Sequence, residues 1–520
     1  MGNIESKFDA VLVLDFGGQY CHLIARMVRE EGVYSEIVLC DITADELLKI
    51  GDRLNIKGII LSGGPASVYT EGAPQLDPKI LDLNIPILGL CYGHQLIAHM
   101  FQGRVERGVK REYGSASVTI DKSSDILANL NSEETVWMSH YDTVYNLPDE
   151  FEVLAHTENC TIAAFRHTKK PLYGLQWHPE VVHTEHGTTV LRNFIFNICK
   201  CKANWKPASI AERVVDEIKT IVGERRAIIA LSGGIDSATA AILASKAIGT
   251  NLTAVFVDHG FMREGEPEFV KKTFTELGVK ILIIDARKRF FKKLENVTEP
   301  EKKRKIIGYE FIKVFEEVAE KIMSEYLIQG TIYPDRIESG VRKRSEMIKS
   351  HHNVAGLPSQ MSFKAIIEPL RNIYKDEVRE TAKSLGLRNE IVYRQPFPGP
   401  GLAVRIIGKI TPDRVKLLRK ADAIIAEEIE KSEELRATLW QYFAVLTDTK
   451  STGVRGDSRA YGAVLAIRVV KSREAMTASF ARVPYDILER ISSRITNELP
   501  QITRVVYDIT HKPPATIEWE

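Results

Sequence analysis

A cysteine lies between closely spaced glycines in the segment Gly89-Leu90-Cys91-Tyr92-Gly93, directly after an apolar run. The pattern G-x-nucleophile-x-G between a strand and a helix is typical of a sharp turn that exposes a nucleophile above a sheet. The N-terminus of the following helix favours the thiolate, which is the nucleophilic form of the side chain. A buried core cysteine is the common alternative, but the flanking glycines favour nucleophilic catalysis by Cys91.

A base and an orienting carboxylate for this thiol are found further along the chain. His178 and Glu180 are separated only by a proline, so in an extended chain their side chains point the same way. Glu180 can then hold the imidazole while His178 takes the proton of Cys91. The backbone N–H groups of Gly64 and Tyr92 are the predicted oxyanion donors, because glycine lets the backbone approach closely.

A glycine-rich loop follows another apolar run and opens a helical pattern that continues through Ala238. Its residues are Ser232, Gly233, Gly234, Ile235, Asp236 and Ser237. Glycine-rich backbone amides at a helix N-terminus form an anion site, and the serine hydroxyls add donors. The pattern of a Walker A loop is not found here. An ordinary capped turn is the alternative, and Asp236 either holds Mg²⁺ or caps the helix.

The elements that must position these groups alternate between strand and helix. In the first part of the chain, apolar runs predict strands at 11–14, 58–61 and 85–90, with helices through 23–28 and from near Gly93. Continuous apolar strands joined by helices indicate a parallel sheet covered on both faces. Chemistry in such sheets gathers at the carboxyl ends of the strands, and the cysteine lies at one of them.

The same alternation restarts after residues 200–209, which break the periodicity and contain Pro207, so a linker is expected there. The strands and helices predicted beyond it lie at 227–231, 238–247, 252–257, 280–284, 298–321 and 326–329. The segment Pro-Phe-Pro-Gly-Pro-Gly at 396–401 can be neither helix nor central strand. It is expected to open a third domain with a helix at 412–432 and a strand at 504–509.

These patterns predict an α/β protein with two doubly wound parallel-sheet domains, followed by a smaller α+β C-terminal domain. The expected domains are 8–202, 203–395 and 396–520. A length of 520 residues fits this number, because a domain takes roughly 100–200 residues.

Composition excludes several classes of partner. Lys and Arg together number 70 and Asp and Glu 69, so the chain has no overall basic field for nucleic acid. No apolar run approaches the roughly 18 residues of a membrane helix, and no membrane partner is expected. Six cysteines over this length form no disulfide scaffold, which fits a reducing cytoplasm. Cys199 and Cys201 are not expected to bind zinc, because no second Cys or His pair stands near them.

The first residues carry no secretory signal, because their apolar stretch is too short. Residues 1–6 do match the loose pattern for N-myristoylation of Gly2, but no polybasic patch follows that would strengthen an anchor.

The first chemical motif has a known counterpart. An elbow cysteine, a later His-Pro-Glu and the Gly-Gly-Pro loop at 63–65, in this order across 8–201, resemble the class I glutamine amidotransferase family. The resemblance implies that Cys91 forms a thioester with glutamine and that ammonia is released.

The form Ser-Gly-Gly-x-Asp-Ser at 232–237 is similar to the PP-loop of N-type ATP pyrophosphatases, which cleave ATP to AMP and pyrophosphate. Together the two resemblances imply that glutamine supplies nitrogen, that ATP activates an oxygen as an adenylate, and that ammonia displaces AMP. Placing both sites in one chain makes sense, because water protonates free ammonia and weakens it as a nucleophile.

Further segments resemble the glutamine-hydrolysing GMP synthase family over essentially the whole chain. They lie at 334–340, 349–353, 396–401 and 512–520. The resemblance implies that xanthosine monophosphate (XMP) is aminated to GMP with ATP and Mg²⁺, in a homodimer.

Roles for individual residues follow from the same resemblance. The motifs of a lid over ATP contain Asp335, Glu338 and Lys349. A motif linked to coupling between the sites contains Lys375 and Asp376. The motifs that hold XMP contain Arg304, Arg504, Lys512 and Glu518. Each charge alone could also be a solvated surface group. In the tail, Trp519 and the stiff Pro513-Pro514 favour an ordered segment.

The sequence departs from the family's usual loops around the expected glutamine pocket. The departures are Gly18, Cys21, His22, His94 and Tyr141. Cys91, His178 and Glu180 are kept, so the resemblance still implies an active amidase.

Two other functions compete with this one. Another glutamine-dependent PP-loop ligase, such as one that makes NAD or asparagine, would use a carboxylate acceptor and need not carry the tail motif. A binding or regulatory protein with a degenerate amidase domain is the alternative from another class. The presence of the nucleophile and base argues against it.

Overall fold

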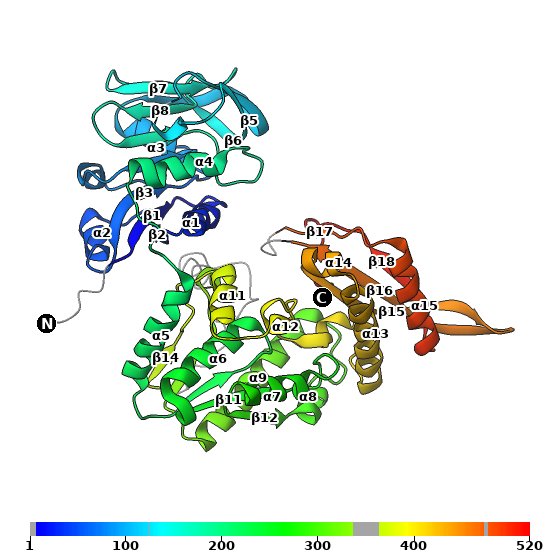
Figure 1. Ribbon diagram of the computed structural model, residues 1–520. Coiled ribbons are helices and arrows are strands. Elements are labelled where there is room, and N and C mark those ends of the chain that lie inside the picture. The colour runs from blue at the N-terminus through cyan, green and yellow to red at the C-terminus, as the bar shows by residue number, and fades with distance from the viewer. Residues whose placement is uncertain (1–6, 124, 336–362, 473–476) are drawn as a thin grey trace. The chain divides into compact units, whose positions relative to one another are not determined.

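The computed structural model describes residues 7–123, 125–335, 363–472 and 477–520. The chain forms two compact units, residues 1–206 and 207–520 (Figure 1). The myristoylation pattern and the predicted lid residues Glu338 and Lys349 lie outside the described residues, so they stay predictions.

The first unit is built on one sheet with helices packed against it. Its strands are β1 (Asp9–Asp15), β2 (Tyr34–Leu39), β3 (Asn55–Leu61), β4 (Ile87–Leu90), β5 (Arg104–Ile120), β6 (Glu133–Asn146), β7 (Phe151–His156), β8 (Ala164–His167) and β9 (Leu172–Leu175). Its α-helices are α1 (Cys21–Glu30), α2 (Ala44–Ile50), α3 (Tyr92–Met100) and α4 (Gly187–Arg192), and α4 continues as a π-helix, η3 (Asn193–Ile198).

This sheet has the strand order β2-β1-β3-β4-β9-β8-β7-β5-β6. The five strands β2, β1, β3, β4 and β9 pair in parallel, and β4 is buried at every position. Of these, β1, β3 and β4 match the predicted strands, whereas β2, β9 and the antiparallel strands were not predicted. The first domain is therefore α/β. Its sheet has a parallel half, in which β4 leads into Cys91, and an antiparallel half beside it.

The second unit contains two sheets. The first has the strands β10 (Ala227–Ala230), β11 (Leu252–Asp258), β12 (Ile281–Asp285), β13 (Tyr326–Ile328) and β14 (Ala365–Ile367). The α-helices that accompany it are α5 (Pro207–Val222), α6 (Ile235–Ile248), α7 (Glu266–Glu276), α8 (Arg287–Lys293), α9 (Pro300–Lys321), α11 (Lys375–Ser384) and α12 (Asn389–Val392).

All pairings in this five-stranded sheet are parallel, in the order β12-β11-β10-β13-β14. Its central strand pair is apolar, and β11 is buried along its length up to Asp258, as a strand covered on both faces must be. The predicted second doubly wound domain is confirmed.

The C-terminal part of the second unit is α+β, as predicted. It contains α13 (Pro412–Glu430), α14 (Glu433–Thr438), β15 (Gln441–Arg455), β16 (Ser458–Lys471), β17 (Ser479–Phe480), α15 (Tyr485–Glu498) and β18 (Ile502–Asp508). Strand β16 pairs antiparallel with β15 and β17 and parallel with β18.

A large apolar core spans both sheets of the second unit. It joins Ile228 and Val255 of the parallel sheet to Leu418 of α13, Leu465 of β16 and Ile491 of α15, all of them buried. Residues 207–520 therefore fold as one compact body. The predicted division of this body at 395/396 stays a prediction.

The predicted linker at 200–209 is wrong at its end, because α5 begins at Pro207. Proline breaks a helix interior but is well suited to its first residue, where no N–H is needed for an intrahelical bond. Its presence marks the start of a helix here and not a loop.

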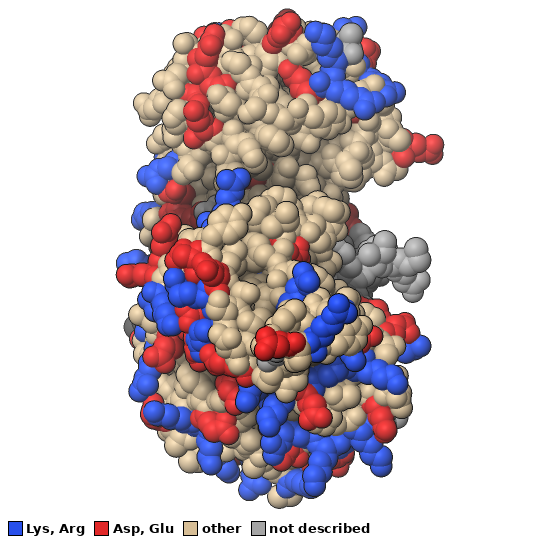
Figure 2. All heavy atoms as spheres, turned by 90° about the vertical axis from the view of Figure 1, so that its right-hand side faces the viewer, with Lys and Arg blue, Asp and Glu red and all other residues tan. Residues whose placement is uncertain are grey.

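Charged side chains of both signs are interspersed on the face shown in Figure 2. None of the helices in the described part of the chain is long and apolar enough to cross a bilayer.

Candidate functional site

Cys91 lies at the turn between β4 and α3, with φ 51° and ψ −100°. A non-glycine residue rarely adopts this backbone conformation, and such strain is typical of a nucleophile held at a sharp turn. The turn is tight on both sides. A Cβ on Gly89 would lie 2.4 Å from the Gly93 carbonyl oxygen, and one on Gly93 would lie 2.6 Å from the Leu61 oxygen. The sequence folds this way because only glycine fits at both places.

His178 and Glu180 follow β9 and form a buried pair. Nδ1 of His178 lies 2.7 Å from a carboxylate oxygen of Glu180, whose side chain is fully buried. The main chain of His178 is also fixed, because its N–H donates to the Trp137 oxygen at 3.1 Å and its oxygen accepts from the Thr184 hydroxyl at 2.6 Å. The imidazole therefore has one orientation, with Nε2 on the side away from the carboxylate.

His178 faces the Cys91 thiol. A Cβ on Gly63 would lie 3.0 Å from Cε1 of His178 and 3.6 Å from Cβ of Cys91, so Gly63 leaves room for both side chains. Burial by itself lowers the pKa of His178, but the charge of Glu180 and the hydrogen bond with Cys91 outweigh it and hold the pKa well above its ordinary value. An imidazolium beside the thiol is the state that this arrangement favours.

The predicted oxyanion donors lie beside this pair. Tyr92 is the first residue of α3, so its N–H is one of the amides that have no partner within the helix. A Cβ on Gly64 would lie 3.3 Å from Cγ of Tyr92, which places the two residues in contact. Their amides are suited to an oxygen that becomes negative next to Cys91.

Two of the departures from the family's loops have a clear place in the structure. His94 is completely buried in α3, its ring lies 4.6 Å from that of Phe165, and burial lowers its pKa to about 3. Tyr141 lies under two guanidinium groups, with Arg107 at 4.0 Å and Arg111 at 4.5 Å from its ring centre. His94 is thus a neutral core residue, and Tyr141 lies close to two cations.

The glycine-rich loop connects β10 to α6. Gly233 has φ 78°, and the Ser232 and Ser237 hydroxyls lie 3.1 Å apart across the loop. The Ser232 hydroxyl accepts from Gly234 N–H at 3.3 Å, and the Ser237 hydroxyl accepts from Ser232 N–H at 3.2 Å. The hydroxyls thus fix the conformation of the loop at the N-terminus of α6, where backbone amides attract an anion.

Asp236 connects this loop to a second predicted motif. Its Oδ2 lies 2.5 Å from Nζ of Lys375, the first residue of α11. Its Oδ1 is buried and has no hydrogen-bond partner among the residues that the structure describes. A free carboxylate oxygen beside a phosphate site is the kind of ligand that Mg²⁺ takes, so Asp236 fits the ion.

A buried ion pair supports the same loop from outside. Arg394 donates two hydrogen bonds to Glu266, at 2.6 and 2.5 Å, and Glu266 is buried. A Cβ on Gly233 would lie 2.5 Å from Glu266 Oε1. The pair therefore lies against Gly233, and only glycine fits between it and the loop.

The C-terminal tail is held by buried cations. Glu518 accepts two hydrogen bonds from Arg405, at 2.9 and 2.8 Å, and the Arg405 side chain is fully buried. Its guanidinium also lies 3.9 Å from the ring centre of Phe443. Glu520 pairs with the buried Lys303, and its main-chain oxygen accepts from Arg304.

The two other residues predicted to hold XMP have different surroundings. Arg504 on β18 donates to the hydroxyl of Ser451 at 2.8 Å. The main chain of Lys512 pairs with Ala478 in an isolated bridge, with hydrogen bonds of 2.7 and 3.0 Å. The tail is therefore ordered, as Trp519 predicts, and its indole N–H donates to Asp508 at 2.9 Å.

Comparison with known families agrees with this organisation. The model of the class-I glutamine amidotransferase family matches residues 12–198, that of the PP-loop domain 207–390, and that of the GMP synthase C terminal domain 427–519. A glutamine-hydrolysing GMP synthase of Caldicellulosiruptor saccharolyticus is 53% identical, covering 99% of this chain and all of that protein. Those of Thermosynechococcus vestitus and Clostridium perfringens are 51% and 50% identical, covering 98% of this chain and 96% and 100% of their own lengths.

The chain belongs to the family of glutamine-hydrolysing GMP synthases.

Within this GMP synthase family member, the structure brings together Cys91, His178 and Glu180, and it places Gly64 against Tyr92. It also joins Asp236 of the PP-loop to Lys375. Of the predicted lid, Asp335 is described, and its carboxylate accepts from Ile332 N–H at 3.2 Å. The catalytic and binding roles of these residues stay predictions.

Sequence reasoning missed several charged residues that the structure places at or near these sites. They are Glu266, Lys303, Arg394 and Arg405. For Arg405 a signal exists, because it is the only charged residue in the apolar segment 402–407. A lone arginine in such a segment indicates a buried cation with a partner elsewhere. The other three lie in ordinary charged surroundings and give no such signal.

Proposed function

We propose that this GMP synthase family member aminates XMP to GMP with nitrogen from glutamine, using its thiol centre and its PP-loop. The observation that supports the proposal most strongly is the buried His178–Glu180 pair facing Cys91, in the same chain as a glycine-rich loop at a helix N-terminus. One centre can release ammonia and the other can activate its acceptor.

In the first unit, the Cys91 thiolate attacks the side-chain amide carbon of glutamine. The oxygen becomes negative and is stabilised by the amides of Gly64 and Tyr92. The imidazolium of His178 gives its proton to the departing nitrogen, so ammonia leaves and a thioester remains. Water then cleaves the thioester to glutamate and restores the thiol.

In the second unit, the PP-loop amides and the hydroxyls of Ser232 and Ser237 hold the phosphates of ATP. The C2 oxygen of XMP attacks the α-phosphorus, pyrophosphate leaves, and an adenylate forms. Ammonia then attacks C2, and AMP leaves with the oxygen. Asp236 would hold Mg²⁺, which neutralises phosphate charge when it is bound. Arg304, Arg504, Lys512 and Glu518 are the proposed XMP residues.

Two variants test this division. Cys91→Ala should abolish GMP synthesis from glutamine but leave synthesis from added ammonia, because only the nitrogen source is lost. Asp236→Ala should depress both routes together. The measurement is GMP formation from XMP, ATP and Mg²⁺ with either nitrogen source, and carboxylate acceptors serve as the comparison. Absence of GMP with either source would contradict the proposal, and amination of a carboxylate would favour another PP-loop ligase.

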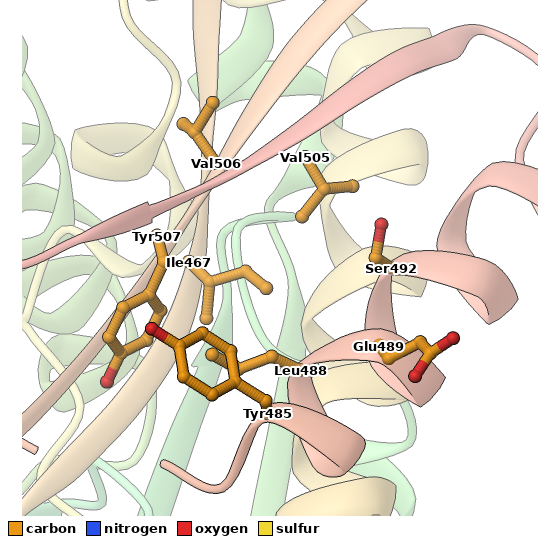
Figure 3. Close-up of a pocket in the computed structure, with 8 residues that line it drawn as sticks. All are labelled: Ile467, Tyr485, Leu488, Glu489, Ser492, Val505, Val506 and Tyr507. Carbon is orange, nitrogen blue, oxygen red and sulfur yellow. The ribbon is translucent and has the colours of Figure 1, made fainter. Parts of the chain in front are cut away.

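The second unit also presents an apolar groove that suits a second copy of the chain. The groove has a volume of about 350 Å³ and is lined by Ile467, Tyr485, Leu488, Glu489, Ser492, Val505, Val506 and Tyr507. Figure 3 shows Tyr485 and Leu488 extending from α15 toward Ile467 and Tyr507 on the sheet. Tyr485 is 90% exposed and Val506 40% exposed, although both are largely apolar.

Among the described strands, β18 pairs only with β16, so one of its edges is open beside this groove. An open edge next to exposed apolar groups is suited to pairing with another chain. We expect a homodimer through this face, and Val506→Glu should raise the fraction of monomer in sedimentation. A wild-type chain that sediments as a monomer would contradict the homodimer.

The cysteines of the described residues are free thiols, which fits the proposal of a cytoplasmic enzyme.

A further inference from the structure

A buried pair in the first unit has no part in the mechanism above. Nε2 of His140, on β6, lies 3.0 Å from a carboxylate oxygen of Glu112, on β5. Nδ1 of the same ring lies 3.0 Å from the main-chain oxygen of Asp142. The side chains of His140 and Glu112 are only 2% and 8% exposed, so water does not substitute for either partner.

Both nitrogens of the His140 ring face groups that accept hydrogen bonds. A main-chain carbonyl only accepts, so Nδ1 carries a hydrogen, and an ionised carboxylate also only accepts. Although burial raises the pKa of Glu112, hydrogen bonds from His140, Thr157 and Asn159 outweigh it and lower the pKa below its ordinary value. The ring is therefore clamped at both ends in one orientation.

The Asp142 oxygen is a junction between segments. It also accepts from the side-chain amide of Gln95 on α3, at 2.8 Å. The same Gln95 amide lies 3.1 Å from the side-chain oxygen of Gln176, which stands between β9 and His178. One buried network thus joins β6, the helix that begins after Cys91, and the segment that carries His178.

The segment that His140 holds also contacts the nucleophile directly. The Cys91 thiol lies 3.7 Å from the main-chain oxygen of Ser139, the residue before His140. A shift of β6 at His140 would therefore move a wall of the thiol site.

We infer that His140, oriented by Glu112, is a positioning residue for glutamine hydrolysis. It fixes the Ser139–Asp142 segment against Cys91 and, through Asp142 and Gln95, keeps the nucleophile helix in register with the segment that carries His178. This inference rests on the proposed amidase function of Cys91.

Glu112, His140 and Cys160 also have their ligand atoms within 4.8 Å of one another, as a metal site would. The hydrogen bonds favour a proton over a metal between His140 and Glu112. Glu112 already accepts from the Thr157 hydroxyl at 2.9 Å, and burial raises the pKa of Cys160 to about 12, which keeps the thiol neutral.

Glu112→Gln removes the charge of this side chain but keeps its ability to hydrogen-bond, whereas Glu112→Ala removes both. Glutamine can donate to Nε2 of a neutral His140 while Nδ1 still donates to Asp142, so the ring keeps its orientation. Alanine removes the partner. We expect kcat for glutamine hydrolysis to stay within about threefold of wild type in Glu112→Gln, and to fall about 100-fold in Glu112→Ala and His140→Ala through misplacement of the thiol site.

The rates are expressed per reactive Cys91 thiol, titrated with an alkylating analogue of glutamine that needs a formed glutamine site, so that unfolded molecules do not count. Ammonia-dependent GMP synthesis should be unchanged in all three variants. Glu152→Gln is the matched control, because Glu152 pairs with Lys122 and Arg166 at the surface of the same unit. It should hydrolyse glutamine like wild type.

Wild-type kcat per thiol in both alanine variants would overturn the positioning role. A Glu112→Gln enzyme as slow as Glu112→Ala would overturn the hydrogen-bond account, since only the charge differs. Stoichiometric zinc in the purified protein would also overturn the hydrogen-bond account, because a metal would then lie between His140 and Glu112. If Cys91→Ala still hydrolysed glutamine, the proposed amidase itself would fail, which is a separate result.

Discussion

At the scale of single residues, the buried pair of His178 and Glu180 sets the charge that lies beside the Cys91 thiol. Burial and the carboxylate act in opposite directions on the imidazole, and the carboxylate with the thiol prevails, so the pKa of His178 is raised. The histidine is therefore charged over a wider range of pH than a free histidine. In the proposed mechanism, this imidazolium supplies the proton that the departing ammonia takes up.

Glu180→Gln should change both the rate and its pH dependence. Without the carboxylate, burial lowers the pKa of His178, so the imidazolium is lost at lower pH as the solution is made alkaline. The alkaline limb of kcat/KM for glutamine should move to lower pH, and the rate at neutral pH should fall by about 100-fold or more. Ammonia-dependent synthesis at each pH is the control. An alkaline limb that does not move would contradict the assigned proton donor.

The sequence predicts this trio because Cys91 lies in one short local motif and the His178–Glu180 pair in another. The Glu112–His140 pair is different. These residues meet only because β5 and β6 pair antiparallel, with Glu112 directly opposite His140 in the register. No local pattern in either segment indicates which partner the other strand will supply.

At the scale of elements, the elbow depends on contacts that exclude any side chain at two glycines. Gly89→Ala would bring a Cβ to 2.4 Å from the Gly93 carbonyl, which is backbone and cannot rotate away. We expect the variant to lose about 1–3 kcal/mol of stability and most of its glutamine-dependent activity. Thermal unfolding and GMP formation from glutamine measure the two effects.

Gly308→Ala is the control for this substitution. Gly308 lies within α9, and a Cβ there meets nothing within 4 Å. Alanine is a better helix residue than glycine, so the control should keep its activity and gain about 0.5–1 kcal/mol. Equal melting temperatures for Gly89→Ala and wild type would contradict the tight turn.

Most parallel strands were predictable because buried parallel strands are continuous apolar runs. Predicted strands at 252–257 and 326–329 lie within one residue of β11 and β13 at each end. Strand β6 was not predicted, although buried and exposed positions alternate along it. Several of its buried positions hold polar residues, among them Glu134, His140 and Asp142. The alternation of buried and exposed positions in β6 therefore does not appear as an alternation of apolar and polar residues in the sequence.

At the scale of the whole molecule, three cations with almost no exposure hold the C-terminal tail. Arg405 pairs with Glu518, Lys303 pairs with Glu520, and Arg468 donates to the main-chain oxygens of Thr510 and Thr516 at 2.5 and 3.1 Å. These contacts join segments more than 40 residues apart. The order of the tail was predictable from its aromatic and proline residues, but its partners were not.

Glu518→Gln should destabilise the second unit. The substitution leaves the fully buried Arg405 with the carboxylate of Asp422 at 3.7 Å as a remaining partner. Breaking a buried ion pair costs about 3 kcal/mol or more, so the melting temperature should fall. An exposed glutamate of the same unit, Glu320, provides the control, since Glu320→Gln should melt like wild type. A Glu518→Gln protein of unchanged melting temperature, but with weaker XMP binding, would make Glu518 a substrate contact only.

The continuous core of the second unit limits how the chain can be divided for engineering. Leu418 and Ile425 of α13 share that core with Ile228 and Val255 beneath the PP-loop strands. A nucleotide-activating module that ended at residue 395 and was fused to another enzyme would expose to water the apolar surface that now packs against α13 and the C-terminal sheet. A designer who wants to transplant the adenylating chemistry should therefore move α13, β15 and β16 along with it, or redesign the face they cover.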